Sequence, residues 1–188
     1  MGRWNRRFQY LGDQFDDIAI LKEYHHPLFE GDTDSENLNY DFNLLKLDSS
    51  SSLQPIRLND QFFVPNTNQA VTAIGFGQTQ PDDGSSESTI LQQVDLKYIP
   101  NEQCSLSSDG LDSYEGLLSE AMMCAADEGK DACFGDSGGP LVARNFDSQP
   151  VDGDPSRTTD VLVGLTSWGF GCADANFPGM PYWSIVTC

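Results

Sequence analysis

The 188-residue sequence contains 38% hydrophobic residues, 17 glycines and 10 prolines, a composition that suits one β-rich domain with many turns. Its formal net charge is −19, from 29 acidic and 10 basic side chains, which argues against nucleic acid and anionic membranes as partners and favours cationic ligands. No stretch is long and apolar enough to span a membrane.

Short apolar runs predict strands, and polar segments rich in Gly, Ser, Asp and Asn separate them. In chain order, strands are expected at residues 18–24, 42–47, 70–77, 91–99, 139–144 and 161–169. In the fourth run, Val94, Leu96 and Tyr98 alternate with charged residues, as in a strand with one buried face. Only residues 113–123 resemble a helix, and weakly. Many short strands favour an antiparallel barrel or sandwich.

The cysteines are spread widely, and no pair has the C-x-x-C spacing of zinc or redox sites. In a loop-rich chain this pattern suggests two disulfides and one leftover thiol, and therefore an oxidising compartment. Residues 1–12 nevertheless contain no apolar stretch that could serve as a signal-peptide core. We therefore expect an extracellular protein whose true beginning, with its signal peptide, is absent from this chain. The cysteines stand at positions 104, 124, 133, 172 and 188.

The stretch DACFGDSGGPLV, residues 131–142, places a single serine among glycines. A serine hydroxyl becomes a useful nucleophile only when a base removes its proton and N–H donors stabilise the oxyanion. Gly135 and the peptide of Ser137 could supply two such N–H groups, because glycine lets the chain curl until both point the same way. The alternative is a plain glycine turn, which would be the better interpretation of a G-x-S-x-G pattern alone.

The serine stretch and several other segments resemble, in the right order, the trypsin/chymotrypsin family of serine endopeptidases, peptidase S1. One segment resembles the family's aspartate-bearing stretch, one its entry to the second barrel and one its methionine–cysteine strand. The resemblance extends over nearly the whole chain. The segments are YDFNLLKL (40–47), GFG (75–77), AMMCA (121–125), GKDACFGDSGGPLV (129–142), SWGFGC (167–172) and NFPG (176–179).

The resemblance implies an all-β fold of two antiparallel β-barrels. Residues 1–60 would be a remnant of the first barrel, and residues 61–188 the second barrel with the serine loop and the specificity pocket. The match fails at both ends: the start has no IVGG-like segment, and after Gly179 the family's closing strand and helix give way to MPYWSIVTC. We therefore expect a chain truncated at both ends, with the first barrel incomplete and the final strand and helix missing or altered.

The resemblance also implies the catalytic roles. Ser137 would be the nucleophile, Asp41 the acid that orients the catalytic histidine, and Gly135 with Ser137 the oxyanion hole. Asp136 would be the acid that pairs, after activating cleavage, with a new N-terminal ammonium. Without that segment, Asp136 is expected to lie buried without its counter-charge.

The catalytic base is the residue that the sequence fails to supply. The family carries its histidine upstream of the aspartate in an AAHC-type segment, whereas this chain has only His25 and His26. Their stretch, EYHHPLF, resembles the family's later HP turn, so a loop role is expected, and a general-base role for either is the minor alternative. The base is therefore expected to lie before Met1, and this chain alone to be inactive.

The specificity pocket implied by the resemblance selects basic side chains. Asp131 would be the carboxylate at its base, and Gly169 and Gly179 the small residues that keep it open. A buried carboxylate favours Lys or Arg because a cationic partner offsets its desolvation. Ser167, Trp168 and Gly169 would pair with the substrate backbone as an added strand.

Two disulfides follow from the same resemblance. Cys104–Cys124 would close one loop, and Cys133–Cys172 would tie the serine loop to the far wall of the pocket. Cys188 would be left without a partner.

The expected function is therefore that of a secreted, monomeric trypsin-like endopeptidase, which forms an acyl-enzyme on Ser137 and cleaves protein or peptide substrates after Lys or Arg. Proteinaceous inhibitors are the further expected partners, and no cofactor or metal is expected. The alternative is a non-catalytic homologue that acts as a binding or regulatory module. The joint presence of Asp41, Asp131, Gly135 and Ser137 disfavours it.

Overall fold

The computed structural model describes residues 2–7, 15–29, 38–61, 65–81, 83–144 and 159–173, and the backbone of the strand Tyr182–Ile185. Strands account for most of its regular structure, so the expected all-β class is confirmed. In chain order the elements are β1 (Ile20–His25), β2 (Asn43–Leu47), β3 (Arg57–Leu58), β4 (Ala70–Gly75), the 3-10 turn η1 (Gly84–Ser86), β5 (Gln92–Ile99), α1 (Asn101–Cys104), β6 (Met122–Ala126), β7 (Pro140–Ala143), β8 (Val161–Thr166) and β9 (Tyr182–Ile185).

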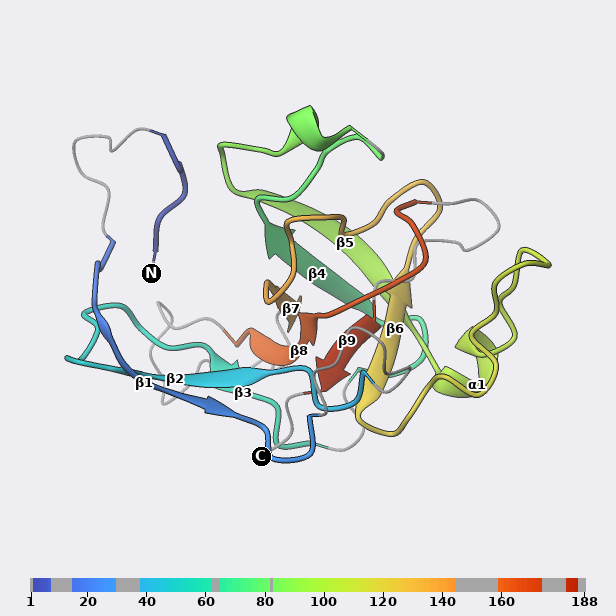
Figure 1. The fold of residues 1–188 in the computed structure, drawn as a ribbon, viewed down its shortest axis with the longest axis horizontal. Helices are drawn as coiled ribbons and strands as arrows, with labels where there is room; N and C mark the ends of the chain where they lie inside the picture. The colour runs from blue at the N-terminus through green and yellow to red at the C-terminus, as the bar shows by residue number, and fades with distance from the viewer. Residues whose placement is uncertain are drawn as a thin grey trace.

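A seven-stranded sheet curls round and closes on itself (Figure 1). Its strand order is β3-β8-β7-β4-β5-β6-β9, and β9 also pairs with β8. The ring of β8, β7, β4, β5, β6 and β9 is therefore a closed antiparallel barrel, to which β3 is added parallel to β8. Closure leaves the ring without free edges, which protects its backbone hydrogen bonds.

The barrel core is built from alternate side chains of its strands. In β5, Leu96 is only 1% exposed, and Val94 and Tyr98 pack against the same cluster, as their alternation predicted. β6 is buried along its whole length because its alternate residues serve two clusters. Met123 lies in the main core and Cys124 in a second one.

The second cluster packs outside β6 around the Cys104–Cys124 disulfide, which confirms that predicted pair. Its largest member is Tyr114, which is fully buried. The weak helix expected over residues 113–123 is wrong: the chain makes a turn, with Gly116 at a φ of 79°, and then enters β6. Burial of Tyr114 against its neighbours outweighs a weak local helix propensity.

A separate two-stranded antiparallel sheet, β1–β2, lies at the lower left of Figure 1. Every residue of β1 and all but the last of β2 are exposed, although the strands are rich in leucine. The exposed large apolar residues here are Ile20, Leu21, Tyr24, Leu44 and Leu45. This sheet therefore forms by strand pairing, with little burial.

All six strands predicted from apolar runs are present, and β6 was expected from the family resemblance alone. β3 and β9 were not predicted individually. β9 forms although its sequence departs from the family's pattern. β3, at residues 57–58, already belongs to the seven-stranded sheet and so precedes the predicted boundary at residue 60. In the part of the chain that is described, no helix has the length and apolar character needed to cross a bilayer.

Candidate active site

Ser137 lies in a tight loop that leads into β7, and it is exposed to solvent. Gly135 and Gly138 have φ values of 92° and 76°, a left-handed conformation that glycine adopts without strain. The Gly138 N–H donates to the Thr166 carbonyl at 2.8 Å, which ties the loop to the end of β8. The glycines are thus required by the loop itself, and the oxyanion-hole role of Gly135 and Ser137 stays a prediction.

A groove of about 210 Å³ opens beside Ser137. The predicted substrate-binding residues Ser167, Trp168 and Gly169 all line it, so the structure brings them together with the proposed nucleophile. Gly179, the remaining predicted pocket residue, lies outside the described residues. The groove is lined by Ala132, Cys133, Phe134, Ser137, Thr166, Ser167, Trp168, Gly169, Gly171 and Cys172.

Asp41 reaches the groove from the other sheet. The Ser167 hydroxyl donates to Asp41 Oδ2 at 2.6 Å, across 126 positions of sequence. Asp41 is half-buried, just before β2, and Ser167 follows β8 directly. A carboxylate predicted to orient a catalytic base thus lies against a residue that lines the same groove as Ser137.

The two histidines are placed differently. His25 is exposed, with its Nε2 atom 3.9 Å from Glu23 Oε2. His26 is half-buried and stacks on the Tyr40 ring, and its Nδ1 atom accepts the Leu28 N–H at 3.3 Å. Within the described part of the chain, neither histidine makes a hydrogen bond to Asp41 or Ser137.

Asp131 faces a second cavity, of about 280 Å³, which lies against β4 and β5. Its Oδ2 atom accepts the Ala173 N–H at 2.8 Å, whereas its Oδ1 atom is buried without a hydrogen-bond partner. Burial raises the pKa of Asp131 to about 7; the N–H groups of Ala173 and Ala132 oppose the rise, and the charge of Asp136 adds to it. The role of Asp131 at the base of a specificity pocket stays a prediction.

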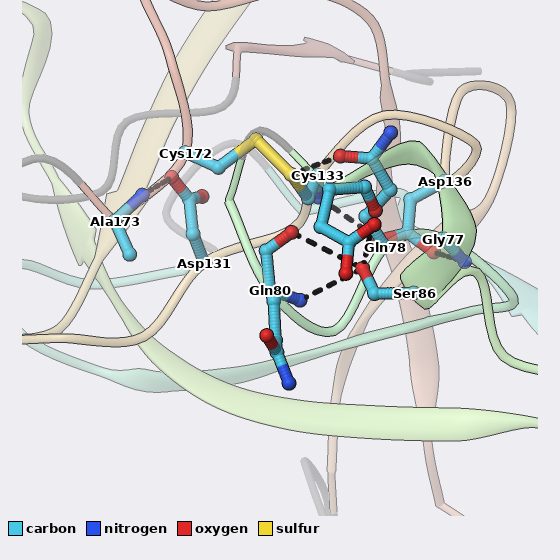
Figure 2. The surroundings of a disulfide bond; sticks show 10 residues. Gly77, Gln78, Gln80, Ser86, Asp131, Cys133, Asp136, Cys172 and Ala173 are labelled. Carbon is cyan, nitrogen blue, oxygen red and sulfur yellow. Dashed lines mark hydrogen bonds between the residues drawn. A yellow bond between two sulfur atoms is a disulfide. The ribbon is translucent and has the colours of Figure 1, made fainter.

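The Cys133–Cys172 disulfide, a confirmed prediction, is the wall that the two cavities share. Figure 2 shows Asp131 with Ala173 near the Cys172 end of this bond, and Asp136 beside Gly77. The groove beside Ser137 and the cavity that Asp131 faces therefore both border this disulfide.

Asp136 is half-buried and lines the same second cavity as Asp131. Among the described residues it forms no ion pair, but its carboxylate accepts the Gly77 N–H at 2.7 Å and the Cys133 N–H at 2.9 Å. Gly75 and Gly77 enclose it so closely that an added Cβ would lie 1.9 Å and 2.5 Å from its oxygens. The GFG segment at 75–77 therefore packs against this carboxylate and supplies one of its N–H donors. The sequence did not reveal this role.

Tyr114 is a further residue that sequence reasoning missed. Its hydroxyl accepts the Phe170 N–H at 3.1 Å, and its ring stacks on Phe170 with centroids 4.9 Å apart. Trp168 packs edge-on against both rings. Tyr114 thus supports the groove-lining segment from behind. A large aromatic side chain within the stretch 113–123 was the available signal.

Comparisons with known proteins identify the family of this chain. The family model "Trypsin" matches residues 9–182. Trypsin alpha of Drosophila melanogaster is 38% identical over 134 residues, which is 71% of this chain and 44% of that protein. Trypsin 5G1 of Aedes aegypti is 32% identical over 169 residues, which is 87% of this chain and 54% of that protein. The chain thus spans about half the length of these curated relatives.

A solved structure supports the fold. Neuropsin, described as a serine protease expressed in the limbic system of mouse brain, superposes with a TM-score of 0.69 at 24% sequence identity, covering 89% of this chain and 66% of that one.

In the described residues, no group of three or more His, Cys, Asp or Glu side chains could hold a metal ion. The fold, the disulfides and the family match lead to one conclusion: the chain belongs to the trypsin family of serine proteases.

Proposed function

We propose that this chain carries the nucleophile, the orienting acid and the substrate groove of a secreted trypsin-like endopeptidase, which cleaves protein substrates after Lys or Arg. The hydrogen bond from Ser167 Oγ to Asp41 Oδ2 is the observation that carries the proposal. This bond holds Asp41, the proposed orienting acid, against Ser167, which lines the same groove as Ser137.

In the proposed reaction, the Ser137 hydroxyl attacks the carbonyl carbon of the scissile peptide while a base takes its proton. The tetrahedral intermediate collapses, the C–N bond breaks, and the base returns the proton to the departing amine. Water then hydrolyses the acyl-Ser137 ester. Asp41 would hold the base in the required orientation, and the N–H groups of Gly135 and Ser137 would stabilise the oxyanion.

The general base is proposed to come from residues outside these 188. His26 is engaged by Tyr40 and the Leu28 N–H, and His25 lies in solvent beside Glu23. The same observation supports the second candidate function, a non-catalytic homologue that binds peptides in the groove. The two candidates differ in whether Ser137 is reactive once the complete protein is present.

Specificity for Lys or Arg is proposed to rest on Asp131. It lines the cavity that shares the Cys133–Cys172 disulfide with the groove, and one of its carboxylate oxygens has no hydrogen bond. A basic side chain that reached it would restore the ionised form. The −19 net charge also favours cationic peptides. Asp136, in the cavity behind, is proposed to receive the ammonium of an activated N-terminus in place of its N–H donors.

Labelling with a fluorophosphonate, which reacts with activated serines, tests the proposal. We expect no labelling of the 188-residue chain. In an extended form, which adds the N-terminal residues proposed to supply the base, we expect labelling at Ser137 and hydrolysis of an arginine ester. Ser137→Ala should abolish both in the extended form, and Asp131→Ser should remove the preference for Lys and Arg. An extended form that binds peptides but stays unlabelled would establish the non-catalytic alternative. Stoichiometric labelling of the 188-residue chain would contradict the proposed source of the base.

A further inference from the structure

Asp41 lies at the centre of a three-residue turn whose first residue is strained. Tyr40 has a φ of 62°, in the left-handed region that non-glycine residues rarely adopt. The Phe42 N–H donates to the Tyr40 carbonyl at 2.7 Å and closes the turn. Strained conformations of this kind persist only where the surrounding structure holds them, and they cluster at functional sites.

His26 supplies the surface that holds this turn. Its ring stacks on Tyr40 with centroids 4.4 Å apart and planes inclined by 15°, and it lies 5.0 Å from the Phe42 ring. His26 is itself fixed, because its Nδ1 atom accepts the Leu28 N–H at 3.3 Å and its carbonyl accepts the Phe29 N–H at 3.0 Å. One ring therefore contacts both sequence neighbours of Asp41.

The opposite side of Asp41 is fixed by the barrel. Ser167 Oγ donates to Asp41 Oδ2 at 2.6 Å from the end of β8. Asp41 accepts this bond from its place within the turn that the Phe42 N–H and the Tyr40 carbonyl close. The stack on the β1–β2 side and the hydroxyl on the barrel side thus act on the same carboxyl group.

In the described residues, strained backbone lies close to the carboxylates of Asp41 and Asp131. The non-glycine residues with positive φ there are Tyr40, Asn68 and Ala173. Asparagine tolerates this conformation well. Ala173 donates its N–H to the Asp131 carboxylate, and Tyr40 directly precedes Asp41. Apart from Asn68, the strain lies beside the two carboxylates to which the proposed function assigns roles.

We propose that His26 and Tyr40 are positioning residues, which form an aromatic clamp that holds the Asp41 carboxylate on Ser167. This inference rests on the proposed role of Asp41 in orienting the catalytic base. In this arrangement His26 acts through its ring face, and no proton transfer to or from it is involved. An aromatic ring at position 26 is therefore the essential requirement, whatever its basicity.

Turnover of an arginine ester by the extended, active form is the first measurement. His26→Ala should lower kcat at least about tenfold with KM unchanged, because a misplaced catalytic group slows the chemical step. His26→Phe keeps a stacking ring and should recover most of that loss. The matched control is Tyr24→Leu, which removes the Lys22–Tyr24 ring contact in the adjoining strand β1 and should leave kcat unchanged. A loss in His26→Phe equal to that in His26→Ala would overturn the clamp.

A double-mutant cycle tests the clamp without relying on activity. Tyr40→Gly relieves the strain and removes the stack, and Ser167→Ala removes the hydrogen bond to Asp41. If the clamp holds the carboxylate on Ser167, the two changes should be coupled by at least about threefold in the urea-unfolding equilibrium constant of the 188-residue chain. Strict additivity would overturn the inference. If the extended form shows no Ser137-dependent hydrolysis, the proposed function fails, while this cycle still decides whether the clamp exists.

Discussion

The closed barrel and the β1–β2 sheet both contain strands with large apolar side chains, yet only the barrel buries them. β6 is buried at every position, whereas every residue of β1 is exposed. The difference lies in pairing: each strand of the ring has two neighbours, and β1 and β2 pair only with each other among the described strands. Apolar content therefore predicts that a strand forms, and its partners decide how much stability it contributes.

Truncation of a leucine in each region should give the largest contrast. Leu141 in β7 is fully buried, and Leu44 in β2 is 63% exposed. We expect Leu141→Ala to lower the free energy of unfolding by about 2–5 kcal/mol, because it leaves a cavity in the barrel core. Leu44→Ala should change it by less than about 0.5 kcal/mol, since little apolar surface is lost. Urea unfolding measures both, and equal losses would show that β2 is covered in solution.

Protein stability should depend on pH with opposite signs at two carboxylates, Asp131 in the loop before β7 and Asp16 in the segment before β1. Asp131 has its pKa raised to about 7, chiefly by burial. Asp16, in the N-terminal part of the chain, has its pKa lowered by hydrogen bonds from the Ser51 hydroxyl and from Ser52. Because folding raises the pKa of Asp131, the stability it contributes is complete below its ordinary pKa of 3.8 and is lost as the pH rises through about 7.

Asp131→Asn removes this cost of burying a charge. The variant should be more stable than the wild type by about 2–4 kcal/mol near pH 8, and the gain should vanish near pH 4. Asp16→Asn is the control, with the opposite expected effect on stability. It should lower stability at neutral pH, and this loss should disappear as the pH falls through the lowered pKa of Asp16. Thermal unfolding across this pH range gives both curves. A constant effect of Asp131→Asn at all pH values would contradict the burial of an ionisable Asp131.

The sequence predicted those features that depend on local pattern. Alternating Val94, Leu96 and Tyr98 identified β5, and the glycines around Ser137 identified a tight loop because left-handed backbone requires them. The family resemblance added the disulfide pairs. Hydrogen bonds between distant segments were beyond such reasoning, since no local periodicity encodes them. The hydrogen bond from the Gly77 N–H to Asp136 joins residues 59 positions apart, and the hydrogen bond from Ser167 to Asp41 joins residues 126 positions apart.

The smallest expected difference in stability is between the same substitution at Tyr114, in the cluster outside β6, and at Tyr24, in β1. The Tyr114 hydroxyl accepts the N–H of the half-buried Phe170, so Tyr114→Phe removes this hydrogen bond while the ring stack stays. We expect a loss of about 0.5–1.5 kcal/mol in unfolding free energy. Tyr24→Phe, the same change on the 44% exposed Tyr24 of β1, should stay within about 0.5 kcal/mol. Because the bond fixes the segment that lines the groove, Tyr114→Phe should also raise KM for an arginine ester in the extended form. An unchanged KM with the expected loss of stability would mean that Tyr114 supports the second cluster alone and leaves the groove unaffected.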